Sequence, residues 1–485
     1  AARSLVKEHN GVDRLIQLLR NLLEKDNLPE NMRTITSGCL LNLTDTYEEI
    51  QDQAIEAGIL DVLLQYLLKF SSDEDVVTHC LLVLSCLADS SNGRTKILEK
   101  SILSSLLNLL EKPLNDDIMD SLLELFGNLC ENDSAKLNLA EMGLCERLVE
   151  IVRAHINSGN VVNGTFNICK TVPDLVILIL TGDASMEHLW KDGQGLVYKE
   201  TLSWLKSNDE NLLIAGALAA GNFARKDSHC IRMLADGVVE ELRSLLKKHS
   251  GRDGDIRMQH AVLCALRNLA IPVQNKAEMV KLGVVDNLVE MMNVETFPVV
   301  FKLLGTLRML LDKQEAVAIK VGENLDFVKR LVGWCNVEDH PGVKGEATRM
   351  LAWSAKNSKA ASVMKNLVKA NALPPVISMM KSEHTVMQNE ALIAITLVAS
   401  HCLSDVEEIA SATDLINVLY QLMSSDIIVP ELTQNALSLL VVLSQSAKLK
   451  SAIINTPIRS DLKALKNHND EKIKELAEKT IQLLE

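Results

Sequence analysis

The chain has 485 residues, of which 47% are hydrophobic and only 3% aromatic, so its core must consist mainly of aliphatic side chains. Its formal net charge of −14 argues against a nucleic-acid-binding protein, because such a protein needs a basic surface to displace counterions from phosphates. No apolar run approaches the ~20 residues that span a bilayer, which excludes a transmembrane segment. The ten cysteines are scattered without a CxxC pair, which favours free thiols in a reducing compartment.

A recurring glycine precedes a leucine- and valine-rich helix at regular intervals along the chain. The motif is a glycine, one or two apolar residues and an acidic residue, and it occurs at Gly11, Gly58, Gly143, Gly237 and Gly283, with degenerate copies at Ser101 and Asn371. The four intervals between neighbouring copies from Gly11 to Gly143 and from Gly237 to Gly283 run from 42 to 47 residues, and the gap of 94 residues after Gly143 accommodates two units. A repeat of this length is typical of a helical solenoid of the HEAT or armadillo type.

A second element follows each glycine helix after a polar turn. It is an apolar helix that ends in Asn-Leu-Ala or a variant, with the asparagine at Asn42, Asn128, Asn222 and Asn268, and with Cys86, Arg308 and Trp353 at the corresponding place in weaker copies. Each unit is therefore predicted to contain a short helix, a glycine turn, a second helix and a long third helix, because glycine readily adopts the turn conformation between the first two. Three helices in ~42 residues is the armadillo pattern, whereas HEAT repeats have two.

The prolines support this division into units. They lie just before a predicted third helix at Pro29, Pro113, Pro298, Pro341 and Pro430, where proline can start a helix, and Pro272 lies just after one. We predict an all-α, right-handed armadillo solenoid of about ten to eleven three-helix units, forming one domain over residues 1–485 with an irregular unit around residues 144–195. The chain begins inside a predicted helix, so we expect a fragment that lacks N-terminal repeats.

No catalytic or cofactor-binding motif stands out from this repeat pattern. The patterns GxxxxGK[ST], GxSxG and HExxH are absent, and the eleven histidines are dispersed. A solenoid whose units contact only their neighbours also lacks the deep pocket that enzymes favour. We therefore predict a non-enzymatic protein with no cofactor and no metal site.

The asparagines at the ends of the third helices are candidates for partner binding. An asparagine side chain offers one acceptor and two donors, so Asn222 and Asn268 could hold an extended peptide backbone. The alternative is that each asparagine caps a neighbouring loop and serves only the fold. Importin-type armadillo proteins place a tryptophan four residues earlier, whereas this chain has Gly38, Glu124, Leu218 and Cys264 there, which argues against a groove for nuclear-import signals.

An acidic cluster at residues 116–120 is the second candidate. Asp117 and Asp120 are three residues apart and therefore share a face of a predicted third helix. They could attract the basic tail of a partner by electrostatic steering. The alternative is that they only stabilise the start of the helix through its dipole, and the acids at 73–75, which hold the same place in their own unit, favour this alternative.

Four segments resemble a known family in more than the general repeat pattern. They are GALAAGNFARKD (216–227), ALRNLAIPVQNKAEM (265–279), FKLLGTLRML (301–310) and SEHTVMQNEAL (382–392). These segments are similar to SmgGDS, the armadillo-repeat GDP-dissociation stimulators of small GTPases. The resemblance covers essentially the whole chain and weakens towards both ends, as in an invertebrate or otherwise distant member.

The resemblance implies a binding protein that stimulates nucleotide exchange on small GTPases and chaperones those with basic, prenylated C-termini. The implied partners are GTPases of the Rho, Rap and Ras types, and the Miro type of the mitochondrial surface. The implied partner-binding residues are Asn268, Asn222, Asp117 and Asp120, and we also predict Arg308 and Arg225 as partner-binding residues. The implied location is the cytoplasm, with association with mitochondria or the endoplasmic reticulum, or nuclear shuttling. The alternative function is a general armadillo scaffold for linear peptides.

Overall fold

The computed structural model describes residues 11–24, 30–45, 48–112, 114–158, 167–424 and 429–485. Within these ranges every regular element is helical, with thirty-two α-helices, three short 3₁₀ helices and no strand. None of the helices in the described ranges combines the length and the apolar character that crossing a membrane would require. The predicted all-α fold is therefore confirmed. The expected start of the chain inside a repeat falls on residues outside the described ranges.

The chain divides into two compact units, Ala1–His229 (unit 1) and Cys230–Glu485 (unit 2). The boundary lies within α16 (Asp227–Ala235). Helices α2 and α3 are followed along the chain by ten successive triplets, each with a short first helix, a second helix and a third helix that is usually the longest. The predicted three-helix unit is thus present throughout the described residues.

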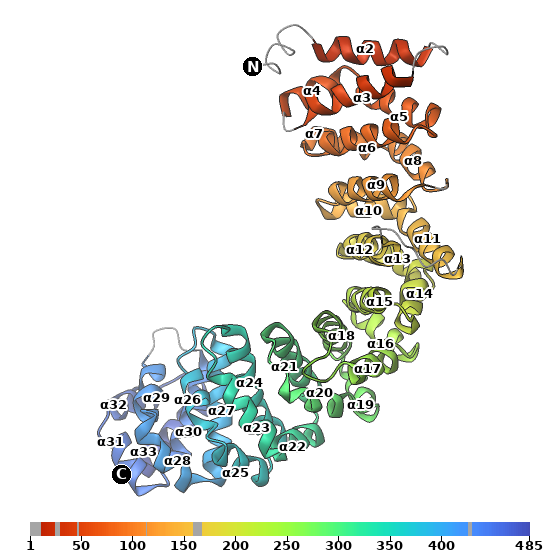
Figure 1. The fold of residues 1–485 in the computed structure, drawn as a ribbon. Helices are drawn as coiled ribbons and strands as arrows, with labels where there is room; N and C mark the ends of the chain where they lie inside the picture. Colours follow the sequence, from red (N-terminus) through yellow and green to blue (C-terminus); the bar gives the residue numbers. More distant parts are fainter. Residues whose placement is uncertain (1–10, 25–29, 46–47, 113, 159–166, 425–428) are drawn as a thin grey trace. The chain divides into compact units, whose positions relative to one another are not determined.

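Unit 1 contains a row of third helices in which each helix packs against the next (Figure 1). This row consists of α3 (Glu30–Thr44), α6 (Glu74–Ala88), α9 (Asp116–Leu129), α12 (Ile168–Leu180) and α15 (Glu210–Phe223). The other helices of unit 1 are α2 (Gly11–Glu24), α4 (Glu48–Glu56), α5 (Ile59–Lys69), α7 (Ser91–Ile97), α8 (Lys100–Leu109), α10 (Asp133–Glu141), α11 (Leu144–Ser158), α13 (Asp183–Trp190) and α14 (Leu196–Ser203), with 3₁₀ turns at Lys191–Gly193 and Trp204–Lys206.

Unit 2 contains a second such row (Figure 1). It consists of α18 (Ile256–Leu269), α21 (Phe297–Leu311), α24 (Pro341–Ser358), α27 (Thr385–His401), α30 (Pro430–Leu443) and α33 (Glu471–Leu484). The other helices are α17 (Val238–Lys248), α19 (Val273–Lys281), α20 (Val284–Glu290), α22 (Glu315–Glu323), α23 (Leu325–Cys335), α25 (Ala361–Lys369), α26 (Leu373–Met379), α28 (Leu403–Ala412), α29 (Leu415–Met423), α31 (Ala447–Ile454) and α32 (Ile458–Leu465), with a 3₁₀ turn at Met291–Asn293.

A third helix inside a row is apolar on two sides because it lies between two neighbours of that row. Helix α21 shows this well, since ten of its fifteen residues are buried and most of these are leucine or valine. The core is aliphatic, as the composition predicts, with one aromatic cluster in unit 1 formed by Trp190, Tyr198, Phe223 and the ring of His229. Only the remaining narrow face of each third helix can meet a partner.

The glycines between the first two helices of a unit adopt the left-handed conformation that the motif predicts. Their φ angles lie between +76° and +83° at Gly58, Gly143, Gly237 and Gly283. Asn371 makes the same turn with φ of +59°, and Lys191–Gly193 makes it inside the 94-residue gap where no motif was visible. The degenerate copy at Ser101 differs, because α8 begins after Glu99 in an extended conformation.

The prolines occupy the predicted helix starts wherever the structure describes them. Pro298, Pro341 and Pro430 lie in the first turn of α21, α24 and α30, where a missing N–H costs no hydrogen bond. Pro272 is the N-cap of α19, just after α18. Pro29 and Pro113 lie outside the described residues.

Two glycine substitutions are expected to have opposite effects on stability. A Cβ added at Gly143 or at Gly127 would meet no atom within 4 Å, so neither change creates a clash. Gly143 has φ of +83°, and alanine in that conformation costs about 1–2 kcal/mol. Gly127 lies within α9, where alanine is favoured over glycine by up to ~1 kcal/mol. In thermal unfolding followed by circular dichroism, Gly143→Ala should lower the midpoint and Gly127→Ala should raise it; a Gly143→Ala variant as stable as the wild type would contradict this account.

Candidate functional site

One face of α9 in unit 1 carries an unpaired row of acidic side chains. Asp117, Asp120 and Glu124 are exposed and lie three and four residues apart, and Asn128 continues the same face. No ion pair within the described chain involves any of the three carboxylates. The row is therefore free to bind a basic segment. Glu124 was not among the predicted site residues, although its spacing of four from Asp120 is visible in the sequence.

Residues other than Asp117 and Asp120 cap the N-terminus of α9 and of the third helix before it. Asn115, not an aspartate, caps α9 by accepting a hydrogen bond from the backbone N–H of Ile118 at 2.9 Å. In the preceding unit Asp73 caps α6 in the same way through the N–H of Val76, at 3.2 Å. Since α9 already has its cap, Asp117 and Asp120 are not needed for capping, although they still lie near the positive end of its dipole.

Asn222 and Arg225 lie at the end of α15, two helices along the row from α9. Asn222 is half-buried, and its Nδ2 donates to the carbonyl of Leu218 in its own helix at 3.0 Å. Arg225 instead reaches α12, where Nη1 donates to the carbonyl of Thr181 at 2.7 Å and Nη2 donates to that of Leu180. The guanidinium thus caps the C-terminus of α12, where carbonyls lack partners within the helix and a positive charge is favoured.

Loss of this cap should destabilise unit 1. Hydrogen bonds from a charged group contribute about 1.5–3 kcal/mol, so Arg225→Ala should lower the free energy of unfolding by roughly that amount. Lys226→Ala is the matched control, because Lys226 makes an exposed ion pair with Glu187 and such pairs contribute about 0–1 kcal/mol. The measurement is thermal unfolding of both variants, and equal midpoints would contradict the capping role of Arg225.

Asn268 lies in the corresponding place on α18 in unit 2. It is half-buried, and its backbone carbonyl accepts hydrogen bonds from the N–H of Ile271 at 3.1 Å and from the thiol of Cys230 at 3.5 Å. Cys264 and His260 precede it on the same helix, and burial together with the charge of Lys302 lowers the pKa of His260. The face leading to Asn268 is therefore occupied by a neutral imidazole and a thiol.

Arg308 belongs to a ladder of charges that links three third helices of unit 2. Its side chain on α21 is only 7% exposed and donates to Glu346 on α24 through Nε at 2.8 Å and Nη2 at 3.1 Å. Arg349, one turn further along α24, makes an equivalent two-pronged contact with Glu390 on α27, at 2.8 and 2.7 Å. The ladder fixes the spacing of α21, α24 and α27. Contact of Arg308 with a partner stays a prediction.

The sequence predicts that Trp353 takes the place of the asparagine on α24, and this prediction is wrong. The residue equivalent to Asn222 is Asn357, because both lie two residues before the C-cap and both donate to the carbonyl four residues earlier. For Asn357 that carbonyl belongs to Trp353, at 3.0 Å. The error was one helical turn. Trp353 instead lies beside Arg308, whose guanidinium carbon is 5.0 Å from the ring centroid.

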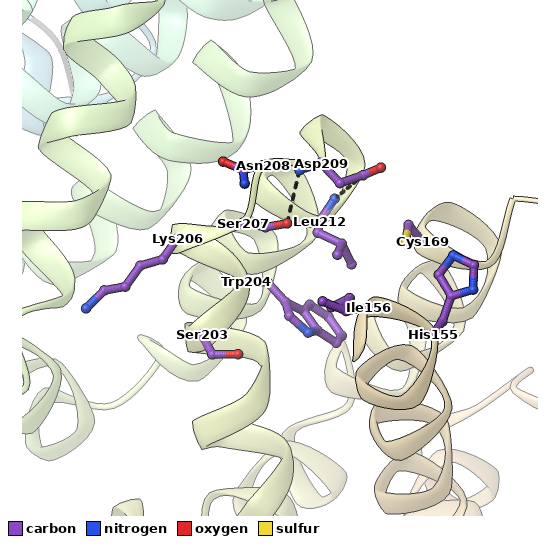
Figure 2. A pocket seen from close by; sticks show the side chains of 10 residues that line it. All are labelled: His155, Ile156, Cys169, Ser203, Trp204, Lys206, Ser207, Asn208, Asp209 and Leu212. Carbon is purple, nitrogen blue, oxygen red and sulfur yellow. Dashed lines mark hydrogen bonds between the residues drawn. The ribbon is translucent and has the colours of Figure 1, made fainter. Parts of the chain in front are cut away.

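A cavity of about 830 Å³ lies within unit 1 beside α11, α12 and the start of α15 (Figure 2). Its lining combines apolar side chains such as Ile156, Trp204 and Leu212 with polar ones such as Lys206. Asp209 is committed to capping α15, since it accepts hydrogen bonds from the N–H groups of residues 211 and 212. Burial raises the pKa of the Cys169 thiol, which keeps it protonated. The cavity therefore offers a place for binding but no activated nucleophile.

The chain is similar to several curated proteins over nearly its whole length, although no protein-family model matches it. It is 34% identical to Rap1 GTPase-GDP dissociation stimulator 1-A of Xenopus laevis over 483 residues, which cover 99% of this chain and 79% of that protein. It is 35% identical to stimulator 1-B of the same organism over 481 residues, with the same coverage. It is 31% identical to the GTPase-GDP dissociation stimulator vimar of Drosophila melanogaster over 511 residues, covering 96% of this chain and 79% of that protein.

Solved structures show the same architecture at low sequence identity. A chain from a structure concerned with the interaction between cadherin and β-catenin matches with a TM-score of 0.65 and 16% identity, over 98% of this chain and 97% of that one. An engineered protein matches with a TM-score of 0.55 and 18% identity, over 98% of each chain. Likeness at this level concerns the fold alone, and it agrees with the predicted armadillo solenoid.

Proposed function

The chain belongs to the family of GTPase-GDP dissociation stimulators, and from that premise we propose that it binds small GTPases and promotes their release of GDP. The observation that carries the proposal is the 31 to 35% identity to three such stimulators over at least 96% of the chain. The unpaired acidic face of α9 supports it, because small GTPases with basic tails would be attracted to such a face. The alternative, a general scaffold for linear peptides, agrees with the fold but receives no support from the three relatives.

The proposed mechanism requires no covalent chemistry. A protein that binds the nucleotide-free GTPase more tightly than the GDP-bound form must, by linkage, weaken the affinity for GDP by the same factor. Each 1.4 kcal/mol of that difference corresponds to about tenfold. The state of the buried thiols is compatible with a non-enzymatic protein, since burial raises the pKa of Cys80 and Cys130 to about 12 and that of Cys335 to about 11.

We assign separate roles to the predicted site residues. Asp117 and Asp120, together with Glu124, attract the basic tail of the GTPase to unit 1. Asn222 and Asn268 hydrogen-bond the partner's backbone. Among the described residues the side-chain amide of Asn222 bonds only through Nδ2 to the carbonyl of Leu218, so its second N–H and its oxygen can serve this role. Arg225 and Arg308 act indirectly by holding neighbouring third helices in place. These roles rest on position, exposure and hydrogen bonding.

The finer assignments come from the resemblance alone. We propose Rho, Rap and Ras types as partners, with the Miro type as a further candidate, and a chaperone role for prenylated forms in the cytoplasm, at mitochondria or endoplasmic reticulum, or in the nucleus. Affinities for the same GTPase with and without its prenyl group test the chaperone role, since equal affinities would contradict it. Fractionation of cells that express the labelled protein tests its location.

The proposed function is tested by comparing two states of one GTPase. Calorimetric titration with a Rap- or Rho-type GTPase should give at least about tenfold tighter binding to the nucleotide-free state than to the GDP-bound state. A scaffold for linear peptides would bind the isolated C-terminal tail as tightly as the whole GTPase and would not distinguish the two states. That result would favour the alternative function.

Asn268→Ala is expected to weaken GTPase binding while leaving the fold intact. Removal of an interfacial hydrogen-bonding group that leaves its partner unsatisfied costs about 1–3 kcal/mol, so the dissociation constant should rise at least about fivefold. The measurement is calorimetric titration, together with thermal unfolding of the free variant. If Asn268 only braces the loop after α18, the variant will lose thermal stability and keep its affinity.

A further inference from the structure

A second cavity, of about 560 Å³, lies entirely within unit 2 on a different side of α24 from the charge ladder. The end of α23, the first half of α24, helix α26 and the start of α27 line it. On α24 its lining residues Pro341, Gly345 and Thr348 follow helical spacing, whereas Glu346 and Arg349 face α21 and α27. The cavity is therefore a separate feature from the residues assigned to GTPase binding.

The apolar part of the cavity lining is of two kinds, and polar side chains such as Asn336, Ser378 and Ser382 also line the cavity. Pro341, Pro374 and Pro375 form rigid surfaces, whereas Met379 and Met387 have flexible, polarisable side chains that adapt to an occupant. Gly345 leaves open space, because a Cβ built there meets no atom within 4 Å. This combination suits the insertion of one large apolar side chain.

Two lysines at the cavity have no acidic partner. Lys344 and Lys381 are exposed lining residues, and no hydrogen bond or ion pair of the described chain engages either ammonium group. The acids at positions 338, 339 and 383 are not paired with them in the described chain, and Glu346, two residues from Lys344, is paired with Arg308 instead. In a chain of net charge −14, two unpaired lysines beside one apolar cavity favour an acidic occupant.

The cavity is formed in advance of any binding. Gln388 holds the loop before α27 by donating from Nε2 to the carbonyl of Ser382 at 2.8 Å. His340 caps α24 by accepting from the N–H of Val343 at 3.1 Å, and its ring packs near Phe301. An occupant would therefore meet an ordered surface and would not have to order these loops, which favours binding.

The chemistry of the cavity supports binding and not catalysis. The one thiol in its lining is that of Cys335, whose pKa burial raises to about 11. The hydroxyl of Thr348 donates to this sulfur at 3.4 Å, and no histidine or carboxylate contributes to the lining. A protonated thiol without a base cannot act as a nucleophile at neutral pH.

We propose that this cavity of unit 2 binds a linear, acidic peptide segment of a second partner protein. One large apolar side chain of the segment enters between the prolines and methionines. Carboxylates on either side of it pair with Lys344 and Lys381. The proposal does not depend on the GTPase function, because the residues proposed for GTPase binding lie outside this cavity.

The test uses the whole chain and a defined probe. The probe is a fluorescein-labelled peptide in which a leucine–phenylalanine pair is flanked on each side by two glutamates. Fluorescence anisotropy should show binding that weakens with salt. The same peptide with glutamines in place of glutamates, or with serines in place of the leucine–phenylalanine pair, should bind at least about tenfold more weakly.

Two variants and two matched controls locate the binding. An added Cβ meets no atom within 4 Å at Gly345 or at Gly333 on α23, so Gly345→Phe should place its ring in the cavity and abolish peptide binding, whereas Gly333→Phe should not. Lys344→Glu with Lys381→Glu should weaken binding at least about tenfold. Lys329→Glu with Lys369→Glu, at two exposed lysines outside the cavity, changes the net charge equally and should have little effect.

Several outcomes would overturn the proposal. The first is that the wild type fails to bind the acidic peptide. The second is that the Gly345→Phe variant, with unchanged thermal unfolding, binds the peptide as tightly as the wild type. The third is that the control variant Lys329→Glu with Lys369→Glu loses as much affinity as Lys344→Glu with Lys381→Glu. A dimer of the wild type that Gly345→Phe dissociates would show that the occupant is a second copy of this chain. GDP release stimulated normally by the Gly345→Phe variant would keep the two functions distinct.

Discussion

Glu346→Leu is expected to destabilise unit 2 by about 3–5 kcal/mol, because it leaves a buried guanidinium without its counter-charge. The guanidinium is that of Arg308, whose side chain is 7% exposed and makes both of its ion-pair contacts with Glu346. Arg349 would lose a weaker contact at 3.8 Å but keep Glu390. The measurement is urea denaturation followed by circular dichroism.

A double variant separates the destabilisation caused by the unpaired charge from the net contribution of the ion pair to the free energy of unfolding. Arg308→Met with Glu346→Leu removes both charges and replaces them with apolar groups, and such replacements are often neutral or stabilising. Most of the stability lost in Glu346→Leu should therefore return. If the free energy of unfolding of Glu346→Leu lies within about 0.5 kcal/mol of the wild-type value, water or another group compensates the charge of Arg308. That result would contradict the role of the ladder in holding the third helices together.

Asp117→Lys with Asp120→Lys is expected to slow association with a GTPase that has a basic tail by about tenfold or more at low salt. The change amounts to four charge units on the exposed face of α9, where neither carboxylate has an ion-pair partner in the described chain. The difference from the wild type should shrink at 1 M salt, where the screening length falls to ~3 Å. Stopped-flow measurement of the association rate at several salt concentrations tests this expectation.

Asp405→Lys with Glu408→Lys is the matched control for this charge reversal. Both residues are exposed on α28, have the same spacing of three and change the net charge equally. A GTPase without its basic tail should associate equally with all three proteins. If the acids of α9 act only on the helix dipole, the double variant will lose up to about 1 kcal/mol of stability per acid and associate at the wild-type rate at every salt concentration.

The repeat could be predicted from the sequence because its signals are local. A glycine such as Gly237 marks a left-handed turn by its own conformational freedom, and a proline such as Pro341 marks a helix start by its fixed φ. The turn at Lys191–Gly193 was not predicted because residues other than glycine also adopt the left-handed conformation there. The misplacement of Trp353 by one turn had a related cause, since apolar positions one turn apart look alike in a repeating helix.

The candidate site was less predictable because its contacts join distant residues. Arg308 and Glu346 are 38 residues apart, and nothing near Arg308 in sequence indicates that it is buried and paired. Arg225 reaches the end of α12 from 44 residues away, so its capping role follows only from the stacking of the units. The acids on α9 were predictable because they lie on one turn of one helix and remain exposed.

The most direct test of the account is the rate at which a GTPase releases GDP. A Rap- or Rho-type GTPase loaded with a fluorescent GDP analogue would be mixed with increasing amounts of the protein and an excess of unlabelled nucleotide. The account predicts a release rate that rises with protein concentration to a plateau at least about tenfold above the spontaneous rate, and a smaller rise for Asn268→Ala at subsaturating concentrations. A release rate equal to the spontaneous one at every concentration, for each GTPase that the protein demonstrably binds, would contradict it.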